Sequence, residues 1–433
     1  MKGDLFDCYR VRGGIPLAGD LHPRGSKNAA LPILAACLLT QGEVVLSNLP
    51  DIRDVRKMLG LLESLGVSVS GSFPEGLRLN ASNIDPDGLD HDGCREIRAS
   101  ILLAGPLTAR SGRVTLPPPG GDVIGKRRLD THFLALEQMG AEVSLEGRLL
   151  SFRANGLRGR SIFLDEPSVT ATENALMAAA VAEGETVIYN AACEPNVQDL
   201  AAMLKSMGSR ISGAGTNRLS VHGAGGLLKG CAHRICPDHI EIGSFIGLAA
   251  CCGGKVRISD VPDEIIRPVM NGFSKLGVTV EEEDGSLSVD GSAPLAVRQD
   301  RGGAIPTVYD APWPGFSPDL TSTAVVVATQ SRGISLIFEK MFESRLFFVD
   351  KLVSMGADII QCDPHRVVVS GPSRLRGTDV SSPDIRAGMA LLTAALCAEG
   401  TSIIRNVHQI QRGYENLVER LRGLGADISS GSF

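Results

Sequence analysis

The sequence predicts an α/β protein with two domains, each an inside-out barrel that has helices at its centre and sheets around them. Three observations predict this fold. A short motif recurs six times along the 433 residues. The same order of apolar helix, strand and amphipathic helix fills each interval, and the first helix of each interval is apolar on nearly all sides. Six copies of one α/β unit divide naturally into three per domain.

Each copy of the repeat ends in Leu or Met, then glycine, then a small or β-branched residue. The glycines are Gly66, Gly140, Gly208, Gly277, Gly356 and Gly425. A glycine directly after an amphipathic helix is typical of a helix C-cap in the left-handed conformation. The alternative, a solenoid used for binding, fits less well because units near 70 residues are longer than typical solenoid repeats.

Within each copy, an apolar helix comes first. These helices are predicted at residues 29–39, 99–108, 172–182, 244–252, 321–329 and 387–398. A β-branched strand follows, as at 42–46 and 184–188, and then an amphipathic helix, as at 55–65 and 199–207. Short strands such as 357–360 and 367–369 close the unit. Because the first helix of each unit is apolar nearly all round, as in the run Ala178–Ala182, we expect these helices inside and the sheets outside.

The composition is that of an ordinary globular protein. The net charge of −6 gives no general attraction to nucleic acid. Ten scattered cysteines show neither zinc nor redox spacing, so we expect reduced thiols and no metal. No signal peptide is visible in the first residues, and the most apolar run, 245–252, is too short to span a membrane. We therefore expect a cytoplasmic protein without a membrane partner.

Polar residues recur where each buried helix begins. They include Lys27, Arg98, Thr170, Asp319 and Arg386. Helix N-termini carry free N–H groups and partial positive charge, so they favour anions.

A second row of arginines lies thirteen residues before the closing glycine, at the predicted start of the second helix. It comprises Arg53, Arg127 and Arg412, with Arg345 two positions off this register. Arg53, which is followed by Asp54, fits a surface ion pair better. The other arginines predict a multiply anionic substrate, because guanidinium groups suit phosphate and carboxylate.

At these residues the chain resembles the UDP-N-acetylglucosamine enolpyruvyl transferase (1-carboxyvinyltransferase) family. The resemblance covers nearly the whole chain in order. It rests on the segments GSKNAALP (25–32), RAS (98–100), PGGDVIG (119–125), PDHIE (237–241), FESR (342–345), DIRA (384–387) and RGYE (412–415).

The resemblance implies transfer of the enolpyruvyl group of phosphoenolpyruvate to the 3-hydroxyl of UDP-N-acetylglucosamine, with release of phosphate. This reaction opens peptidoglycan precursor synthesis, and it implies no cofactor and no metal. The resemblance also implies that residues 1–26 join 237–433 in one domain. Residues 27–236 would form the other, with a mobile catalytic loop near 117–127.

The same resemblance assigns roles to individual residues. Asp122 would be the proton donor and Asp319 the base for the sugar hydroxyl, with Lys27 and Arg412 also catalytic. Phosphoenolpyruvate would be bound by Lys27, Arg98, Arg127, Arg345, Arg386 and Arg412. The nucleotide sugar would contact Asn28, Arg127, Arg128, Leu129, Asp130, Ser168, Val169, Thr170 and Asp319. Asp384 and Glu194 would lie near the reacting centre. We interpret three histidines as structural: His132, His239 and His408. His132 ends the segment 127–132, which is expected to line the nucleotide site.

The chain departs from the family pattern at several positions. Many members carry Cys where this chain has Asp122, and that Cys is the target of fosfomycin. A carboxyl donor must be held protonated, which burial favours and the arginines oppose. The usual Arg-Pro-x-Asp-Leu-His is Arg-Arg-Leu-Asp-Thr-His at 127–132. The extra Arg128 favours an acidic acceptor and does not exclude UDP-N-acetylglucosamine.

Three other functions stay open at this stage. The chain could be a 5-enolpyruvylshikimate-3-phosphate synthase, a nucleotide enolpyruvyl transferase of secondary metabolism, or an inactive homologue that binds nucleotide sugars. Retention of Lys27, Asp319 and Arg412 argues against the last of these.

Overall fold

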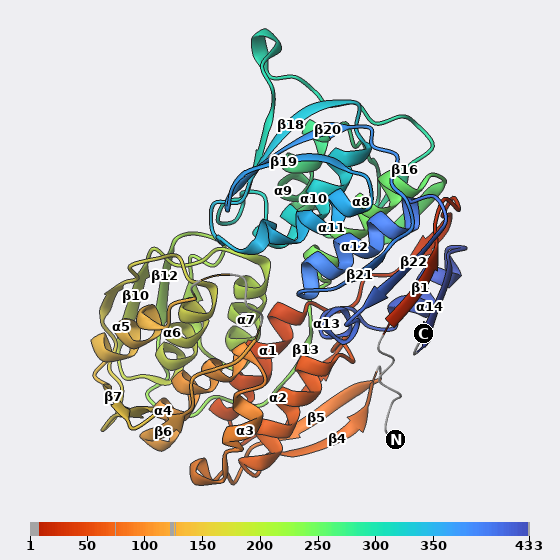
Figure 1. Cartoon of the computed structure of the whole chain (residues 1–433). Helices are drawn as coiled ribbons and strands as arrows, with labels where there is room; N and C mark the ends of the chain where they lie inside the picture. The colour runs from red at the N-terminus through yellow and green to blue at the C-terminus, as the bar shows by residue number, and fades with distance from the viewer. Residues whose placement is uncertain (1–7, 74, 122–124, 126, 432–433) are drawn as a thin grey trace. The chain divides into compact units, whose positions relative to one another are not determined.

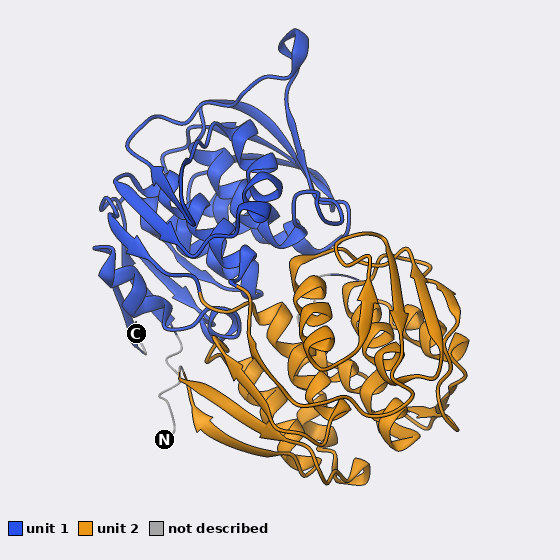
Figure 2. Ribbon diagram, turned by 180° about the vertical axis from the view of Figure 1, so that it is seen from behind, with its two compact units in different colours: residues 1–23, 123–126, 237–433 blue, residues 24–122, 127–236 orange. Residues whose placement is uncertain are grey.

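The computed structural model describes residues 8–73, 75–121, 125 and 127–431. The chain forms two compact units (Figures 1 and 2). Unit 1 comprises residues 1–23, 123–126 and 237–433, and unit 2 comprises residues 24–122 and 127–236. Each unit has its own hydrophobic core. Over the described residues, no helix combines the length and the apolar character needed to cross a membrane.

The centre of each unit is made of helices, as the sequence predicts. In unit 1 the helices α8, α10 and α12 pack against one another in pairs (Figure 1). They span His239–Cys252, Pro318–Gln330 and Ile385–Cys397. In unit 2 the counterparts are α1, α4 and α6, which span Lys27–Ala36, Ala104–Ser111 and Val169–Val181. Almost every residue of these helices is buried, which matches their lack of a polar face.

The predicted helix at 99–108 is not continuous. It begins as the 3-10 helix η3 (Arg98–Leu103) and becomes α-helical at α4. The side chain of Asn174, from α6, donates from Nδ2 to the Ile101 carbonyl at 2.9 Å, and its Oδ1 accepts from Gly105 N at 2.8 Å. These are the two groups that would bond to each other in an α-helix, so Asn174 replaces one helical hydrogen bond with two bonds to its side chain.

Side-chain caps place the start of the inner helices. Ser26, Ser168, Asp238, Ser317 and Asp384 each accept a hydrogen bond from a backbone N–H in the first turn of α1, α6, α8, α10 and α12. The helices therefore begin two or more residues before the apolar runs that predict them. This extension puts polar residues inside the first helical turn.

The described residues form six sheets around these helices, three in each unit. In unit 1 the strand orders are β21-β22-β1-β23, β15-β16-β14-β2 and β17-β18-β20-β19. In unit 2 they are β11-β12-β10-β9, β13-β3-β5-β4 and β6-β8-β7. The strands of unit 1 are β1 (Cys8–Arg12), β2 (Gly19–Leu21), β14 (Lys255–Ser259), β15 (Glu281–Glu283), β16 (Ser286–Asp290), β17 (Thr307–Tyr309), β18 (Gly333–Phe338), β19 (Asp358–Asp363), β20 (Arg366–Gly371), β21 (Asp379–Ser381), β22 (Thr401–Arg405) and β23 (Asp427–Gly431). Those of unit 2 are β3 (Val44–Ser47), β4 (Ser68–Ser72), β5 (Gly76–Asn80), β6 (Arg113–Leu116), β7 (Glu142–Glu146), β8 (Leu149–Arg153), β9 (Ser161–Phe163), β10 (Glu185–Tyr189), β11 (Arg210–Ser212), β12 (Arg218–His222) and β13 (Cys231–Arg234).

Two sheets of unit 1 are completed by the start of the chain. Strand β1 lies between β22 and β23 and is antiparallel to both, with Tyr9 opposite Ile404 and Ser430. Strand β2 adds in parallel to β14. The first and last described strands of the chain therefore belong to one sheet.

A second set of helices carries the closing glycines of the repeat. These helices are α2 (Arg53–Ser64), α5 (Asp130–Gln138), α7 (Pro195–Ser206), α9 (Asp263–Phe273), α11 (Val349–Ser354) and α14 (Leu417–Gly423). The shorter elements are α3 (His91–Cys94), α13 (His408–Gln411), η1 (Cys37–Leu39), η2 (Pro86–Gly88), η4 (Ser274–Leu276), η5 (Arg301–Gly303) and η6 (Arg345–Phe348). All six closing glycines have φ between +90° and +107°, which confirms the predicted left-handed C-caps.

Replacing one of these glycines should destabilise the fold through the backbone alone. A Cβ on Gly208 would meet nothing within 4 Å, but φ there is +107°. We expect Gly208→Ala to lower the free energy of unfolding by about 1 kcal/mol. The control is Gly60→Ala in α2, where a Cβ also meets nothing within 4 Å and φ is helical. That substitution should stabilise by up to about 1 kcal/mol. Chemical denaturation of both variants checks the pair, and equal effects would contradict the conformational explanation.

Candidate active site

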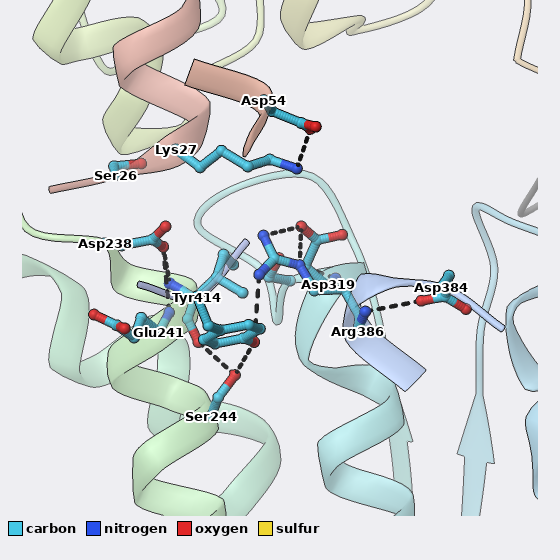
Figure 3. Close-up of polar contacts among 12 residues, drawn as sticks. Ser26, Lys27, Asp54, Asp238, Glu241, Ser244, Asp319, Asp384, Arg386 and Tyr414 are labelled. Atoms are coloured by element: carbon cyan, nitrogen blue, oxygen red, sulfur yellow. Dashed lines mark hydrogen bonds and ion pairs between the residues drawn. The ribbon is translucent and has the colours of Figure 1, made fainter. Parts of the chain in front are cut away.

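Lys27 is the first residue of α1, and its ammonium lies 3.3 Å from the carboxylate of Asp54 on α2 (Figure 3). Only 13% of the Lys27 side chain and 7% of the Asp54 side chain are exposed. Asp54 therefore pairs with Lys27, although it directly follows Arg53 in the sequence and looks like an ion-pair partner of that arginine. Arg53 pairs instead with Glu96, at 3.5 Å on the surface, as expected for an arginine outside the site. Asn28, the next residue of α1, is half-buried.

Arg98 shapes the segment that precedes α5. It starts η3, and its Nη2 donates to the carbonyl oxygens of Arg127 and Arg128 at 2.8 and 3.2 Å. Burial, together with the nearby charge of Arg127, lowers the pKa of Arg98 to about 10. Two guanidinium groups in each other's field favour a bound anion, which would relieve their repulsion.

A buried hydrogen-bond chain runs from α6 to the predicted nucleotide segment. Asn174 uses its Oδ1 and Nδ2 on backbone groups, so its Nδ2 faces Nδ1 of His132, at 2.8 Å, as a donor. Nδ1 of His132 must then carry no proton, and the proton on Nε2 points to Thr170 Oγ1 at 3.0 Å. His132 thus holds the Thr170 hydroxyl in an orientation that leaves its hydrogen free to donate elsewhere.

The neutral state of His132 should appear in the pH dependence of stability. Burial, with the Arg98 charge, lowers the pKa of His132 to about 3 from its ordinary 6.5. The unfolded chain binds this proton between pH 6.5 and 3 and the folded chain does not. Stability from this group is therefore full above pH 6.5 and is lost as pH falls toward 3. We expect His132→Gln to remove about 1.4 kcal/mol per pH unit from the slope in that window. His222→Gln, at an exposed histidine, is the matched control.

Arg128 has partners that the sequence does not reveal. Its Nε lies 3.1 Å from Asp130 and its Nη2 lies 3.2 Å from Asp165, and these carboxylates raise its pKa. The expectation that Arg128 favours an acidic acceptor is therefore weakened, because two acids already compensate its charge. Leu129 precedes α5, and Asp130 is the first residue of that helix. Ser168 caps α6 and Val169 is its first residue.

Glu194 precedes α7 and lies close to a second acid. Burial raises the pKa of Glu173, on α6, well above its ordinary value. A hydrogen bond from Asn196 Nδ2 at 2.8 Å opposes this shift, and the charge of Glu194 adds to it. Glu194 is thus one of two carboxyl groups that lie close together in unit 2.

In unit 1 the predicted residues Asp319, Arg345 and Arg386 meet directly. Oδ1 of Asp319 accepts from Arg345 Nη2 at 2.9 Å. Oδ2 of Asp319 accepts from Arg386 Nε at 3.0 Å (Figure 3). The side chains of Arg345 and Arg386 are 2% and 6% exposed, whereas that of Asp319 is 23% exposed. The carboxylate is therefore the accessible member of the cluster, and the two arginines hold it from behind.

Tyr414 completes this cluster. Its hydroxyl accepts from Arg386 Nη1 at 3.3 Å and lies 2.9 Å from Ser244 Oγ on α8. Burial alone would lower the pKa of Arg386, but Asp319, Tyr414 and Asp238 outweigh it and raise the pKa. Arg386 is thus permanently charged. Arg412, just before Tyr414, donates from Nη1 to Gln409 at 3.2 Å.

Three helix starts meet at this cluster. Asp319 is the second residue of α10, Arg386 the second of α12, and Asp238 the cap of α8. Asp384 caps α12 by accepting from the backbone N–H groups of Arg386 and Ala387 at 2.8 and 2.9 Å. The polar residues at these three helix starts therefore lie together within unit 1.

Equal spacing from the closing glycine does not give equal positions. Arg53 starts α2, but Arg127 lies three residues before α5 and Arg412 five residues before α14. The late start of α14 follows from Asn416, whose left-handed backbone (φ +47°) interrupts the helical path. The predicted row of arginines at helix starts is thus wrong for Arg127 and Arg412.

Asp122, the predicted proton donor, lies outside the described residues. Among the residues that the structure does describe, no group of three or more His, Cys, Asp or Glu side chains is arranged to hold a metal ion. Sequence reasoning missed the partners Asp54, Asn174, Ser244 and Tyr414. Of these, Tyr414 carried a signal, because it lies in the segment RGYE that supports the family resemblance.

Comparison with known proteins places the chain among the enolpyruvyl transferases. Residues 11–421 match the family model described as EPSP synthase (3-phosphoshikimate 1-carboxyvinyltransferase). The UDP-N-acetylglucosamine 1-carboxyvinyltransferase of Bradyrhizobium diazoefficiens is 54% identical over 420 residues, covering 97% of both chains. That of Treponema pallidum is 54% identical over 423 residues, covering 98% of this chain and 99% of the relative. The chain belongs to the UDP-N-acetylglucosamine 1-carboxyvinyltransferase family.

Solved structures agree on the fold of this 1-carboxyvinyltransferase family member. The enolpyruvyl transferase NikO from Streptomyces tendae matches with a TM-score of 0.88 and 24% identity over 99% of both chains. EPSP synthase from Acinetobacter baumannii matches with a TM-score of 0.71 and 18% identity, covering 98% of this chain and all of that chain. At these identities the likeness concerns the fold, which is the two-unit α/β fold of the enolpyruvyl transferases.

Proposed function

We propose that the protein transfers the enolpyruvyl group of phosphoenolpyruvate to the 3-hydroxyl of UDP-N-acetylglucosamine and releases phosphate. This step would supply peptidoglycan precursors in the cytoplasm. The full-length relatives at 54% identity support the reaction. The observation that carries the proposal is the Asp319 carboxylate, accessible on one side and held by Arg345 and Arg386 on the other.

The proposed chemistry is an addition followed by an elimination. The acceptor oxygen forms a bond to C2 of phosphoenolpyruvate as its proton passes to a base, for which Asp319 is the candidate. The vinyl CH2 gains a proton, for which Asp122 is the candidate donor. Phosphate then leaves as the new methyl group gives up a proton, so atoms and charge balance.

Charge stabilisation is the task proposed for the basic residues. Phosphoenolpyruvate carries a phosphate and a carboxylate, and Lys27, Arg98, Arg127 and Arg412 are the candidate groups to bind them. Thr170, oriented by His132, is a candidate donor to the nucleotide sugar. Asn28 and the segments 127–130 and 168–170 are proposed to contact the same substrate, with Asp384 and Glu194 near the reacting centre.

An acceptor screen tests the proposal. The protein is mixed with phosphoenolpyruvate and, separately, UDP-N-acetylglucosamine, shikimate 3-phosphate, UMP or no acceptor, and phosphate release is measured. We expect release that depends on UDP-N-acetylglucosamine. Release only with shikimate 3-phosphate or only with UMP would contradict UDP-N-acetylglucosamine as the acceptor. No release with any acceptor would indicate an inactive homologue that only binds nucleotide sugars.

A further inference from the structure

Behind Arg345 lies a carboxyl group that the proposed chemistry does not use. Glu339 follows strand β18 and is fully buried. Its backbone N–H donates to the His365 carbonyl at 2.8 Å, and its own carbonyl lies 2.7 Å from His365 Nδ1. Its Oε1 accepts from Phe342 N at 3.2 Å. The residue is therefore fixed at both its backbone and its side chain.

Asp310 is a second buried acid beside Glu339. It follows strand β17, which pairs in parallel with β18 so that Tyr309 lies opposite Phe338. Residues that follow neighbouring parallel strands emerge at the same edge of the sheet, which brings Asp310 and Glu339 together. The Asp310 carboxylate accepts hydrogen bonds from Lys340 N and from Met341 N, the latter at 3.2 Å.

Arg345 lies between Glu339 and the accessible carboxylate of Asp319. Its Nη2 is 2.9 Å from Asp319 Oδ1, while its Nε is 3.8 Å from Glu339 Oε2. In the described part of the chain neither Nε of Arg345 nor Oε2 of Glu339 has a hydrogen-bond partner. A small movement of the guanidinium would therefore form a bond to Glu339 and lengthen the bond to Asp319.

Charge balance explains why Arg345 stays with Asp319. Burial raises the pKa of Glu339 to about 9, the charge of Arg345 opposes this shift, and the charge of Asp310 adds to it. With Glu339 neutral, Asp319 is the ionised carboxylate that Arg345 contacts, at 2.9 Å. Among the described residues, Thr321 of α10, which has no charge, also faces Glu339, and the His365 ring lies at the Glu339 backbone carbonyl.

We propose that Glu339 is a positioning residue: it supports Arg345 from behind and thereby fixes the orientation in which the Asp319 carboxylate meets the acceptor hydroxyl. This inference rests on the proposed function of Asp319 as a base. It adds a residue that never touches substrate but on which the rate depends. Ionisation of Glu339 draws the guanidinium of Arg345 toward Oε2 and away from Asp319.

The test compares wild type, Glu339→Ala, Glu339→Gln and the control Glu399→Gln between pH 6 and 10. Glu399 is 57% exposed and pairs with Arg374 on the surface, so its change from carboxyl to amide should not alter turnover. We expect Glu339→Ala to lower kcat about 100-fold, with KM for phosphoenolpyruvate within about threefold of wild type. Glu339→Gln keeps the size of the side chain and has no charge, so its kcat should be at least about tenfold higher than that of Glu339→Ala. The ratio of wild-type to Glu339→Gln kcat should be constant below pH 8 and fall above about pH 9.

A stability measurement separates this inference from the reaction itself. The pKa of Glu339 is about 9 in the folded state against an ordinary 4.5, so its stabilisation is full below pH 4.5 and is lost as pH rises toward 9. The urea midpoint of wild type should therefore fall relative to Glu339→Gln over that range. If wild type gives no turnover but the urea midpoints behave this way, the proposed reaction is wrong, while the finding that Glu339 is a buried neutral acid is supported. A flat kcat ratio, or Glu339→Ala within about threefold of wild type, would overturn the positioning role. If Glu339→Ala does not fold, the Gln comparison decides alone.

Discussion

Asp319→Asn should lower kcat about 1000-fold, because general-base catalysis by a positioned side chain contributes roughly that much. The amide cannot take the proton of the acceptor hydroxyl. It also removes the negative charge that balances Arg345 and Arg386, whose side chains are almost fully buried. We therefore expect lower stability as well, since removing one partner of a buried ion pair costs about 3–5 kcal/mol.

A second substitution separates these two effects. Asp319→Glu keeps the charge and the arginine contacts but moves the carboxylate by about one methylene. We expect it to retain stability and still lose about 100-fold in kcat, as misplacement of a catalytic group does. Asp379→Asn, at a surface acid paired with Arg405, is the matched control. Steady-state kinetics and urea midpoints check these variants. If Asp319→Asn keeps more than about a tenth of wild-type kcat, Asp319 is not the general base.

Asp122→Ala should abolish turnover to a similar degree, because the vinyl carbon then lacks its proposed proton donor. Asp122 lies outside the described residues, so this prediction comes from the sequence motif PGGDVIG. Asp122→Cys should keep measurable turnover and gain time-dependent inactivation by fosfomycin, because a thiolate is a far better nucleophile than a carboxylate. Wild type should show no such inactivation. Stoichiometric, time-dependent loss of wild-type activity with fosfomycin would contradict the prediction that Asp122 replaces the reactive Cys. Asp87→Ala, at an exposed acid paired with Arg113, is the control for Asp122→Ala.

The repeat made most of the fold predictable from the sequence. A glycine after each outer helix and an apolar helix without a polar face are local patterns with one physical meaning, so the six C-caps and the central helices were predicted correctly. The break between η3 and α4 was not predictable. It depends on Asn174, which lies about 70 residues away in the sequence and inserts between Ile101 and Gly105 only in the folded unit.

The site was predictable in its residues and not in its pairings. Asp319, Arg345 and Arg386 stand at helix starts in the sequence and meet in unit 1. Asp54 looks like a partner for its neighbour Arg53, yet adjacent helix residues point in different directions and Asp54 meets Lys27 of another helix. Glu339 and Asp310 carry no local signal, because a parallel strand pair brings them together.

Strand β1 has a consequence for how the protein is made. Residues 8–12 are synthesised long before β22 (Thr401–Arg405) and β23 (Asp427–Gly431), which are their neighbours in the sheet. At a synthesis rate of about 5–20 residues per second, on the order of 20–80 seconds pass between the synthesis of Tyr9 and Val11 and that of their partner strands. Unit 2 has all its residues by position 236 and is free to fold during this wait. Strand β1 is thus among the last strands of unit 1 to be paired, and until then both of its edges are open to pairing with other chains.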